Sequence, residues 1–153
     1  MTNKKITLAA YQPDIPQNIG ALMRLCVGMD IELHIIEPCG FVWDERKIKQ
    51  SAMDYRDHAT VIRHKHWDKF SAWANNRRII LLTTKTENNL YEFSFLPDDI
   101  LLLGRESAGV PIEIHNASTH HIKIPMRGNV RSFNVAMSGA IALAEALRQV
   151  GQI

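Results

Sequence analysis

Arg78-Ile-Ile-Leu-Leu-Thr83 and Asp99-Ile-Leu-Leu-Leu103 are the two clearest buried strands in this sequence. Each is a short run of apolar residues next to polar ones, which is typical of a strand covered on both faces. Shorter or more mixed runs of the same kind occur on either side of this pair. We interpret four of them as further strands: Ile6–Tyr11, Glu32–Ile36, Thr60–Arg63 and Ile122–Pro125.

Segments with helical spacing alternate with these strands. The predicted helices are 18–29, Asp44–Met53, His66–Asn75 and Asn134–Val150. Asn18 and Asp44 are candidate N-caps for the first two helices, and Ser132 or Asn134 for the last. Strands that are separated by helices pair in parallel. The sequence therefore predicts an α/β fold, a parallel sheet flanked by helices.

Length and composition indicate one ordinary globular domain, residues 1–153. The chain is 46% hydrophobic and 22% charged, which argues against a disordered protein. The formal net charge of +2 does not by itself mark a nucleic-acid binder, so any basic face must come from local placement. The two cysteines form no disulfide framework, and we see neither a signal peptide nor a membrane span. We expect a cytoplasmic protein without a membrane partner.

Several common ligand motifs are absent from the sequence. No two glycines are separated by a single residue, so the dinucleotide fingerprint GxGxxG is missing. Gly104 and Gly109 have the spacing of a phosphate-binding loop, but Val110-Pro111 replaces the lysine and hydroxyl residue that such a loop requires. The histidines match no zinc motif, so we expect no metal.

Three polar features have both a structural and a functional interpretation, and the sequence does not decide between them. Ser132-Phe-Asn134 could cap the last helix or direct polar groups at a ligand. Arg24 lies between Met23 and Leu25, so it either reaches to solvent or is held in a site. A candidate phosphate-binding face is formed by Arg63–Trp67 with Arg46, Lys47, Lys49, Arg77 and Arg78.

Three segments together carry a resemblance to a known family. They are Tyr11–Cys26 (YQPDIPQNIGALMRLC), Leu103–Pro111 (LGRESAGVP), and Ile124–Met126 followed by Arg131–Ala136 (RSFNVA). In this order they resemble motifs one, two and three of the SPOUT superfamily of RNA ribose methyltransferases. The linking segments are similar to its short TrmL-like branch, which modifies the wobble nucleotide of tRNA. The match covers nearly the whole chain.

The resemblance implies a fold and partners that the residue patterns alone do not. The C-terminal part would thread through a loop to form a deep trefoil knot, which is an exception to the usual rule against knots. S-adenosylmethionine would bind in the knot as co-substrate, and a homodimer would complete the site for tRNA, at the anticodon loop. No DNA is expected as a partner.

The resemblance also assigns site residues. The implied cofactor contacts are Leu82, Gly104, Glu106, Ile124, Met126 and Ser132. The implied catalytic or RNA-site positions are Asn18, Arg24, Glu106, Ser132 and Asn134. We expect Arg24 to lie beside the bound cofactor, with Asn18 and Asn134 holding Arg24 and the ribose. Because a guanidinium has no acceptor, we expect Arg24 to grip a phosphate while phosphate or water takes the hydroxyl proton.

The sequence departs from the branch pattern at a few positions, which affects the predicted substrate. Ala21, Ala136, Met137 and Ala144 replace residues usual in that branch. Lost polar groups near the site weaken the assignment to the wobble nucleotide, whereas methyl transfer is less affected. The alternatives are methylation of rRNA, or a non-catalytic RNA-binding or assembly module that keeps the fold.

Overall fold

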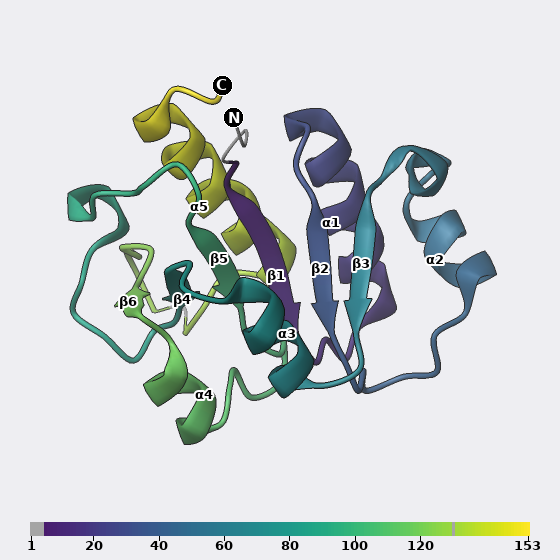
Figure 1. Cartoon of the computed structure of the whole chain (residues 1–153), viewed down its shortest axis with the longest axis horizontal. Coiled ribbons are helices and arrows are strands. Elements are labelled where there is room, and N and C mark those ends of the chain that lie inside the picture. Colours follow the sequence, from purple (N-terminus) through teal and green to yellow (C-terminus); the bar gives the residue numbers. More distant parts are fainter. Residues whose placement is uncertain (1–4, 130) are drawn as a thin grey trace.

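A computed structural model describes residues 5–129 and 131–153, so the polar stretch Met1–Lys4 lies outside the described residues. Within these ranges, six strands form one fully parallel sheet of order β3-β2-β1-β5-β4-β6 (Figure 1). The strands are β1 (Thr7–Tyr11), β2 (Leu33–Ile36), β3 (Val61–His64), β4 (Ile79–Leu82), β5 (Ile100–Leu103) and β6 (His120–Ile122). The predicted parallel α/β fold is confirmed.

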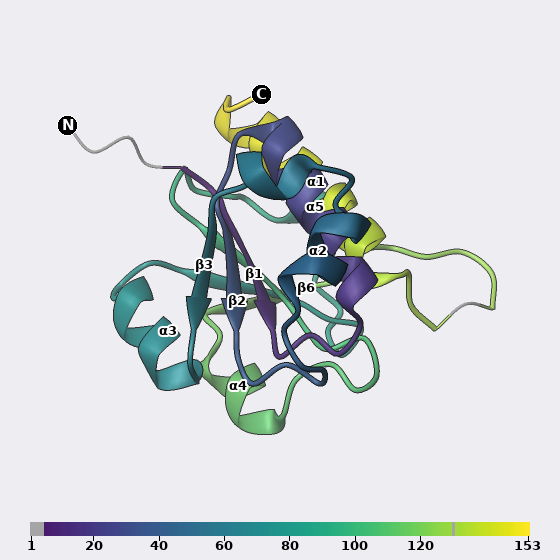
Figure 2. The same ribbon diagram turned by 90° about the vertical axis from the view of Figure 1, so that its right-hand side faces the viewer.

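Helices cover both faces of the sheet. One face carries α1 (Pro16–Met29), α2 (Glu45–Ser51) and α5 (Val135–Val150), and the other carries α3 (Trp67–Ala74) and α4 (Ile112–Ala117) (Figure 2). Two short 3₁₀ turns, η1 (Tyr55–His58) and η2 (Leu90–Glu92), complete the described elements. The sheet is thus the middle of three layers.

Two apolar clusters, one on each face, bury the sheet. Leu22 of α1 and Leu143 of α5 belong to the cluster on one face, and Phe70 of α3 and Ile114 of α4 to the cluster on the other. All residues of β1 and β5 are buried. Burial on both faces explains why these strands read as continuous apolar runs rather than as alternating ones.

The ends of some elements differ from the prediction. Asn18 does not cap α1: the cap position is Ile15, and Pro16 occupies the first turn, where its missing N–H costs nothing. The last strand is His120–Ile122 rather than Ile122–Pro125, and Pro125 lacks the N–H that a ladder needs. Asp44 and Asn134 do cap α2 and α5, as predicted.

The last helix is fastened to the segment between β4 and β5. Gln149 accepts a hydrogen bond from the Phe95 N–H at 2.9 Å and donates one to the Phe93 carbonyl at 2.8 Å. Gln152 donates to the Pro97 carbonyl and accepts from the Ile6 N–H, both at 3.0 Å. These contacts hold the C-terminal end of the chain beside the start of β1 (Figure 1).

Candidate active site

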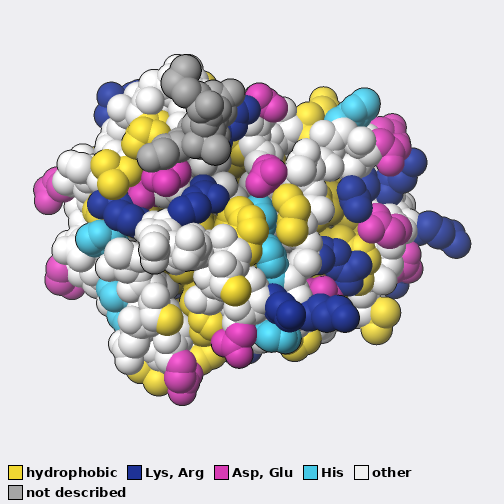
Figure 3. All heavy atoms as spheres, in the orientation of Figure 1, with side chains coloured by type: hydrophobic (Ala, Val, Ile, Leu, Met, Phe, Trp, Pro, Cys, Tyr) yellow, Lys and Arg dark blue, Asp and Glu magenta, His cyan; other side chains and the backbone are white. Residues whose placement is uncertain are grey.

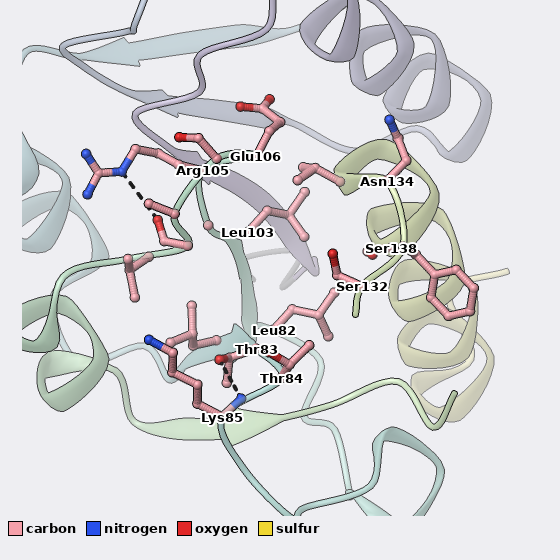
Figure 4. A pocket seen from close by; sticks show the side chains of 18 of the residues that line it. Leu82, Thr83, Thr84, Lys85, Leu103, Arg105, Glu106, Ser132, Asn134 and Ser138 are labelled. Carbon is pink, nitrogen blue, oxygen red and sulfur yellow. Dashed lines mark hydrogen bonds between the residues drawn. The ribbon is translucent and has the colours of Figure 1, made fainter. Parts of the chain in front are cut away.

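A pocket of about 430 Å³ opens at the carboxyl ends of β4 and β5. Most of its lining comes from three segments: residues 81–85 at the end of β4, residues 103–110 at the end of β5, and residues between 124 and 138 that lead into α5. Ile15, Asn18 and His115 complete the lining. Figure 4 shows Glu106 and Asn134 on one side of this pocket and Leu82 to Lys85 on the other. Open parallel sheets bind ligands at the carboxyl ends of their strands, so this position suits a ligand site.

A tight hairpin forms the wall after β5. Arg105 and Gly109 exchange two backbone hydrogen bonds, of 2.9 and 3.0 Å. A Cβ atom at Gly104 would lie 2.8 Å from the Gly109 Cα atom, and Gly109 has a positive φ of 65°. A side chain at position 104 would therefore clash with the backbone of Gly109, and position 109 needs glycine for its left-handed backbone conformation.

A chain of hydrogen bonds joins three segments at the rim of the pocket. The Asn18 side-chain amide, buried in α1, donates to Glu106 Oε1 at 3.3 Å. The Asn134 amide donates to Asn18 Oδ1 at 3.2 Å. Asn134 Oδ1 in turn accepts from the Ala136 and Met137 N–H groups and caps α5. The structure thus brings Asn18, Glu106 and Asn134 together. We had expected Asn18 to hold Arg24, but its amide is bonded to Glu106 and Asn134 instead.

Asp14, which the sequence reasoning missed, belongs to the same rim. Its backbone N–H donates to Glu106 Oε2 at 2.8 Å, and its carboxylate accepts from the Ser107 hydroxyl. Burial, followed by the hydrogen bond with Asp14, raises the pKa of Glu106, while the hydrogen bond with Glu106 lowers the pKa of Asp14. The only sequence signal was its place within the first motif.

The residues predicted to contact the cofactor all line this one pocket. They are Leu82, Gly104, Glu106, Ile124, Met126 and Ser132. Thr83, Thr84 and Ser138 line it too and were not predicted. Apolar side chains beside hydroxyls and exposed loop backbone can hold a flat ring and fix its polar edges.

Arg24 is not among the residues that line the pocket. It lies exposed on α1, where Nη1 is 3.2 Å from Met53 Sδ and the guanidinium carbon is 5.4 Å from the Tyr55 ring centroid. The arginine therefore stacks over the segment after α2 and does not meet Glu106, Ser132 or Asn134 within one chain. The expectation that it lies beside the pocket is not met by a single copy.

The candidate basic face is only partly free. Arg77 donates to the Asp98 carbonyl, and Arg78 forms a two-point ion pair with the buried Asp99. Both arginines therefore have structural roles. Basic side chains do gather over the α2 and β3 side of the molecule (Figure 3). The exposed ones there include Arg46, Lys47, Lys49, Arg63 and Lys65.

The described residues hold neither a cluster of metal ligands nor a helix that could span a membrane. Across residues 5–129 and 131–153, no group of three or more His, Cys, Asp or Glu side chains is arranged to hold a metal ion. Over the same ranges, none of the helices has the length and hydropathy needed to cross a bilayer.

Comparison with known proteins identifies the family. Residues 5–144 match the model of the SpoU rRNA Methylase family. The chain belongs to this family. The predicted membership of the SPOUT superfamily of RNA ribose methyltransferases is thereby confirmed.

Relatives within the SpoU methylase family resemble the chain over nearly its full length. A protein of Beijerinckia indica named tRNA (cytidine(34)-2'-O)-methyltransferase is 48% identical over 148 residues, which cover 95% of this chain and 92% of the relative. A protein of the same name from Escherichia coli K12 is 35% identical, with coverage of 95% and 94%. A solved structure described as giving insights into the 2-OH methylation of C/U34 on tRNA has a TM-score of 0.89 at 36% identity, and 97% of each chain is covered.

Proposed function

We propose that this chain transfers a methyl group from S-adenosylmethionine to the ribose 2'-hydroxyl of the wobble nucleotide of tRNA, a cytidine or uridine in the anticodon loop. The observation that carries the proposal is the pocket after β4 and β5. It gathers every predicted site residue except Arg24. The relatives named for this reaction support the choice of substrate. The chain acts as one domain, in the cytoplasm.

The lining of the pocket fits S-adenosylmethionine, which supplies a methyl group on a cationic sulfur. Its volume lies in the range of small-molecule sites, roughly 300–1,000 Å³. Leu82 and Ile124 offer apolar surface for the adenine, with Met126 beside them, while Ser132 offers a hydroxyl. The glycine at position 104 keeps the wall free of a side chain. A trefoil knot formed by the C-terminal segment would hold these walls together.

The ribose 2'-hydroxyl, which accepts the methyl group, must be aligned with the methyl donor. Attack of the 2'-hydroxyl requires it to be in line with the methyl group, and such positioning can lower a barrier by about 7–11 kcal/mol. Asn18, Asn134, Ser132 and Glu106 form the polar rim that orients the ribose. Arg24 grips a phosphate and orients the hydroxyl, whose proton passes to phosphate or to water because a guanidinium cannot accept it.

A homodimer supplies the missing arginine. Since Arg24 lies outside the pocket of its own chain, we assign it to the pocket of a second copy. Large apolar side chains that are exposed near α1 and near the start of α5 support such an interface: Ile15, Met53, Tyr55 and Met137. Burial of this surface would contribute to association.

Nucleoside mapping of RNA tests the proposed reaction. RNA from a deletion strain and from its parent is digested and analysed by mass spectrometry. We expect loss of one 2'-O-methyl group at tRNA position 34 and its return when the gene is restored. Loss from rRNA alone would favour the rRNA alternative, and unchanged RNA would favour a non-catalytic module. Incubation of the purified protein with labelled S-adenosylmethionine and unmodified tRNA then checks that the chain itself carries out the transfer.

A further inference from the structure

Asp14 and Glu106 bring two carboxyl groups together at the rim of the pocket. Glu106 already accepts from Asn18 at Oε1 and from the Asp14 N–H at Oε2. The Asp14 carboxylate accepts from Ser107 at Oδ2 and also interacts with the Glu106 side chain. The two acids therefore join the segment before α1 to the hairpin after β5.

One oxygen of this pair lacks a donor. Asp14 Oδ1 is shielded from solvent and, among the described residues, is the one buried side-chain nitrogen or oxygen without a hydrogen-bond partner. The segment after β2 closes off this side chain, since a Cβ atom at Gly40 would lie 2.5 Å from Asp14 Cβ. A buried acceptor without a donor destabilises the folded state, so the arrangement calls for a hydrogen atom at Asp14 Oδ1.

We propose that Asp14 and Glu106 share one proton when the pocket is empty, and that Asp14 is the positioning residue that sets the charge of Glu106. A proton on Glu106 supplies the donor that the shielded Asp14 Oδ1 lacks. Both side chains are partly buried, and two carboxylates in contact at such a site cannot both ionise at their ordinary pKa. The raised pKa of Glu106 and the lowered pKa of Asp14 agree with a proton that resides mainly on Glu106.

The groups around Asp14 and Glu106 do not supply enough positive charge or hydrogen bonding to keep both carboxyl groups ionised. Asn18 and the backbone N–H groups favour the ionised form of Glu106, but burial and Asp14 act in the opposite direction and come first among the causes. Cys39, from the segment after β2, is neutral because burial raises the pKa of its thiol to about 11. Arg105 is directed at Tyr11, with its guanidinium carbon 5.4 Å from the ring centroid.

The shared proton should make ligand binding depend on pH. This consequence rests on the proposed function, in which S-adenosylmethionine binds in the pocket. A cation in the pocket stabilises the Glu106 carboxylate, so the proton leaves for solvent when cationic S-adenosylmethionine binds. Its demethylated product, S-adenosylhomocysteine, has a neutral sulfur and does not displace the proton. Affinity for the donor should therefore rise by up to tenfold per pH unit while the pair titrates, whereas affinity for the product stays nearly level.

Calorimetry can count this proton. Binding of each compound is measured between pH 5.0 and 7.0 in two buffers of different ionisation enthalpy. We expect the wild-type protein to release more protons with S-adenosylmethionine than with S-adenosylhomocysteine. Asp14→Asn should lose this difference, because its amide can donate to an ionised Glu106 while the backbone N–H bond remains. The matched control Asp68→Asn, on the exposed face of α3, should keep the difference.

A second measurement needs no ligand, so it tests the shared proton independently of the proposed methyltransferase function. The carboxyl carbon of Glu106 is followed by NMR as the pH of the ligand-free protein is raised. Its titration should lie above that of an ordinary glutamate and should move down in Asp14→Asn. An ordinary titration of Glu106, or equal proton release in wild type and Asp14→Asn, overturns the shared proton. Failure of both compounds to bind while Glu106 titrates high would instead overturn the proposed function and keep the proton pair.

Discussion

At the scale of single residues, Asn134 uses both ends of its amide. Oδ1 accepts from the Ala136 and Met137 N–H groups, at 2.9 and 3.2 Å, and so caps α5. Nδ2 donates to Asn18 Oδ1. The sequence left open whether this position caps a helix or serves a site. The structure shows the cap, and it also shows that the same side chain links α5 to the rim of the pocket.

The two functions of Asn134 can be separated by substitution. Asn134→Asp keeps an oxygen for the cap but cannot donate to the buried Asn18. We expect it to lower the free energy of unfolding by about 1 kcal/mol, the loss of one hydrogen bond, and kcat/KM by about tenfold. Asn134→Ala should lose the cap as well, at about 1 kcal/mol of unfolding free energy. Urea denaturation and methyl-transfer assays measure both quantities. Full activity of Asn134→Asp would show that the link to Asn18 is dispensable.

At the scale of elements, α2 rests directly on the backbone of α1. A Cβ atom at Gly20 would lie 2.5 Å from Ser51 Cβ and 2.6 Å from the Ser51 carbonyl carbon. A side chain there would push α2 away from α1. The structure around Gly28, in the same helix, is open, with no such atom within 4 Å among the described residues.

This contrast predicts opposite effects for the same substitution in one helix. Gly20→Ala should lower the free energy of unfolding by about 1–3 kcal/mol through overpacking. Gly28→Ala should raise it by about 0.5–1 kcal/mol, because alanine favours helix and meets nothing there. Urea denaturation of both variants is the measurement. Equal effects of the two changes would contradict the close contact between α1 and α2.

At the scale of the whole molecule, the question is whether Arg24 serves the pocket of its own chain or the pocket of a second copy. Arg24→Ala and Glu106→Gln are each expected to be inactive as homodimers. If Arg24 serves the partner's pocket, a mixed dimer has one pocket with both residues intact. Random mixing of equal amounts should then restore about a quarter of wild-type activity. No recovery, with mixed dimers shown by mass spectrometry, would place Arg24 in its own chain's site.

The parallel sheet and most of its strands could be predicted because they depend on local patterns. Short apolar runs such as 79–82 and 100–103 must be covered on both faces, and only helices on each side do this in an alternating chain. Errors came where local signals compete. Asn18 looks like a cap, but tertiary contacts use its amide, while Pro16 already starts the helix.

The sequence by itself determined the layers of the fold, the family motifs and eight of the residues that line the pocket, since these depend on residue type and on order along the chain. Only the tertiary structure decided which polar atoms meet. The bond from Asp14 to Glu106 spans 92 positions and that from Asn134 to Asn18 spans 116. No local pattern encodes such pairs, because their distance is set by how β1, β5 and the start of α5 come together. The same packing places Arg24 on the outer side of α1, away from the site that its motif suggested.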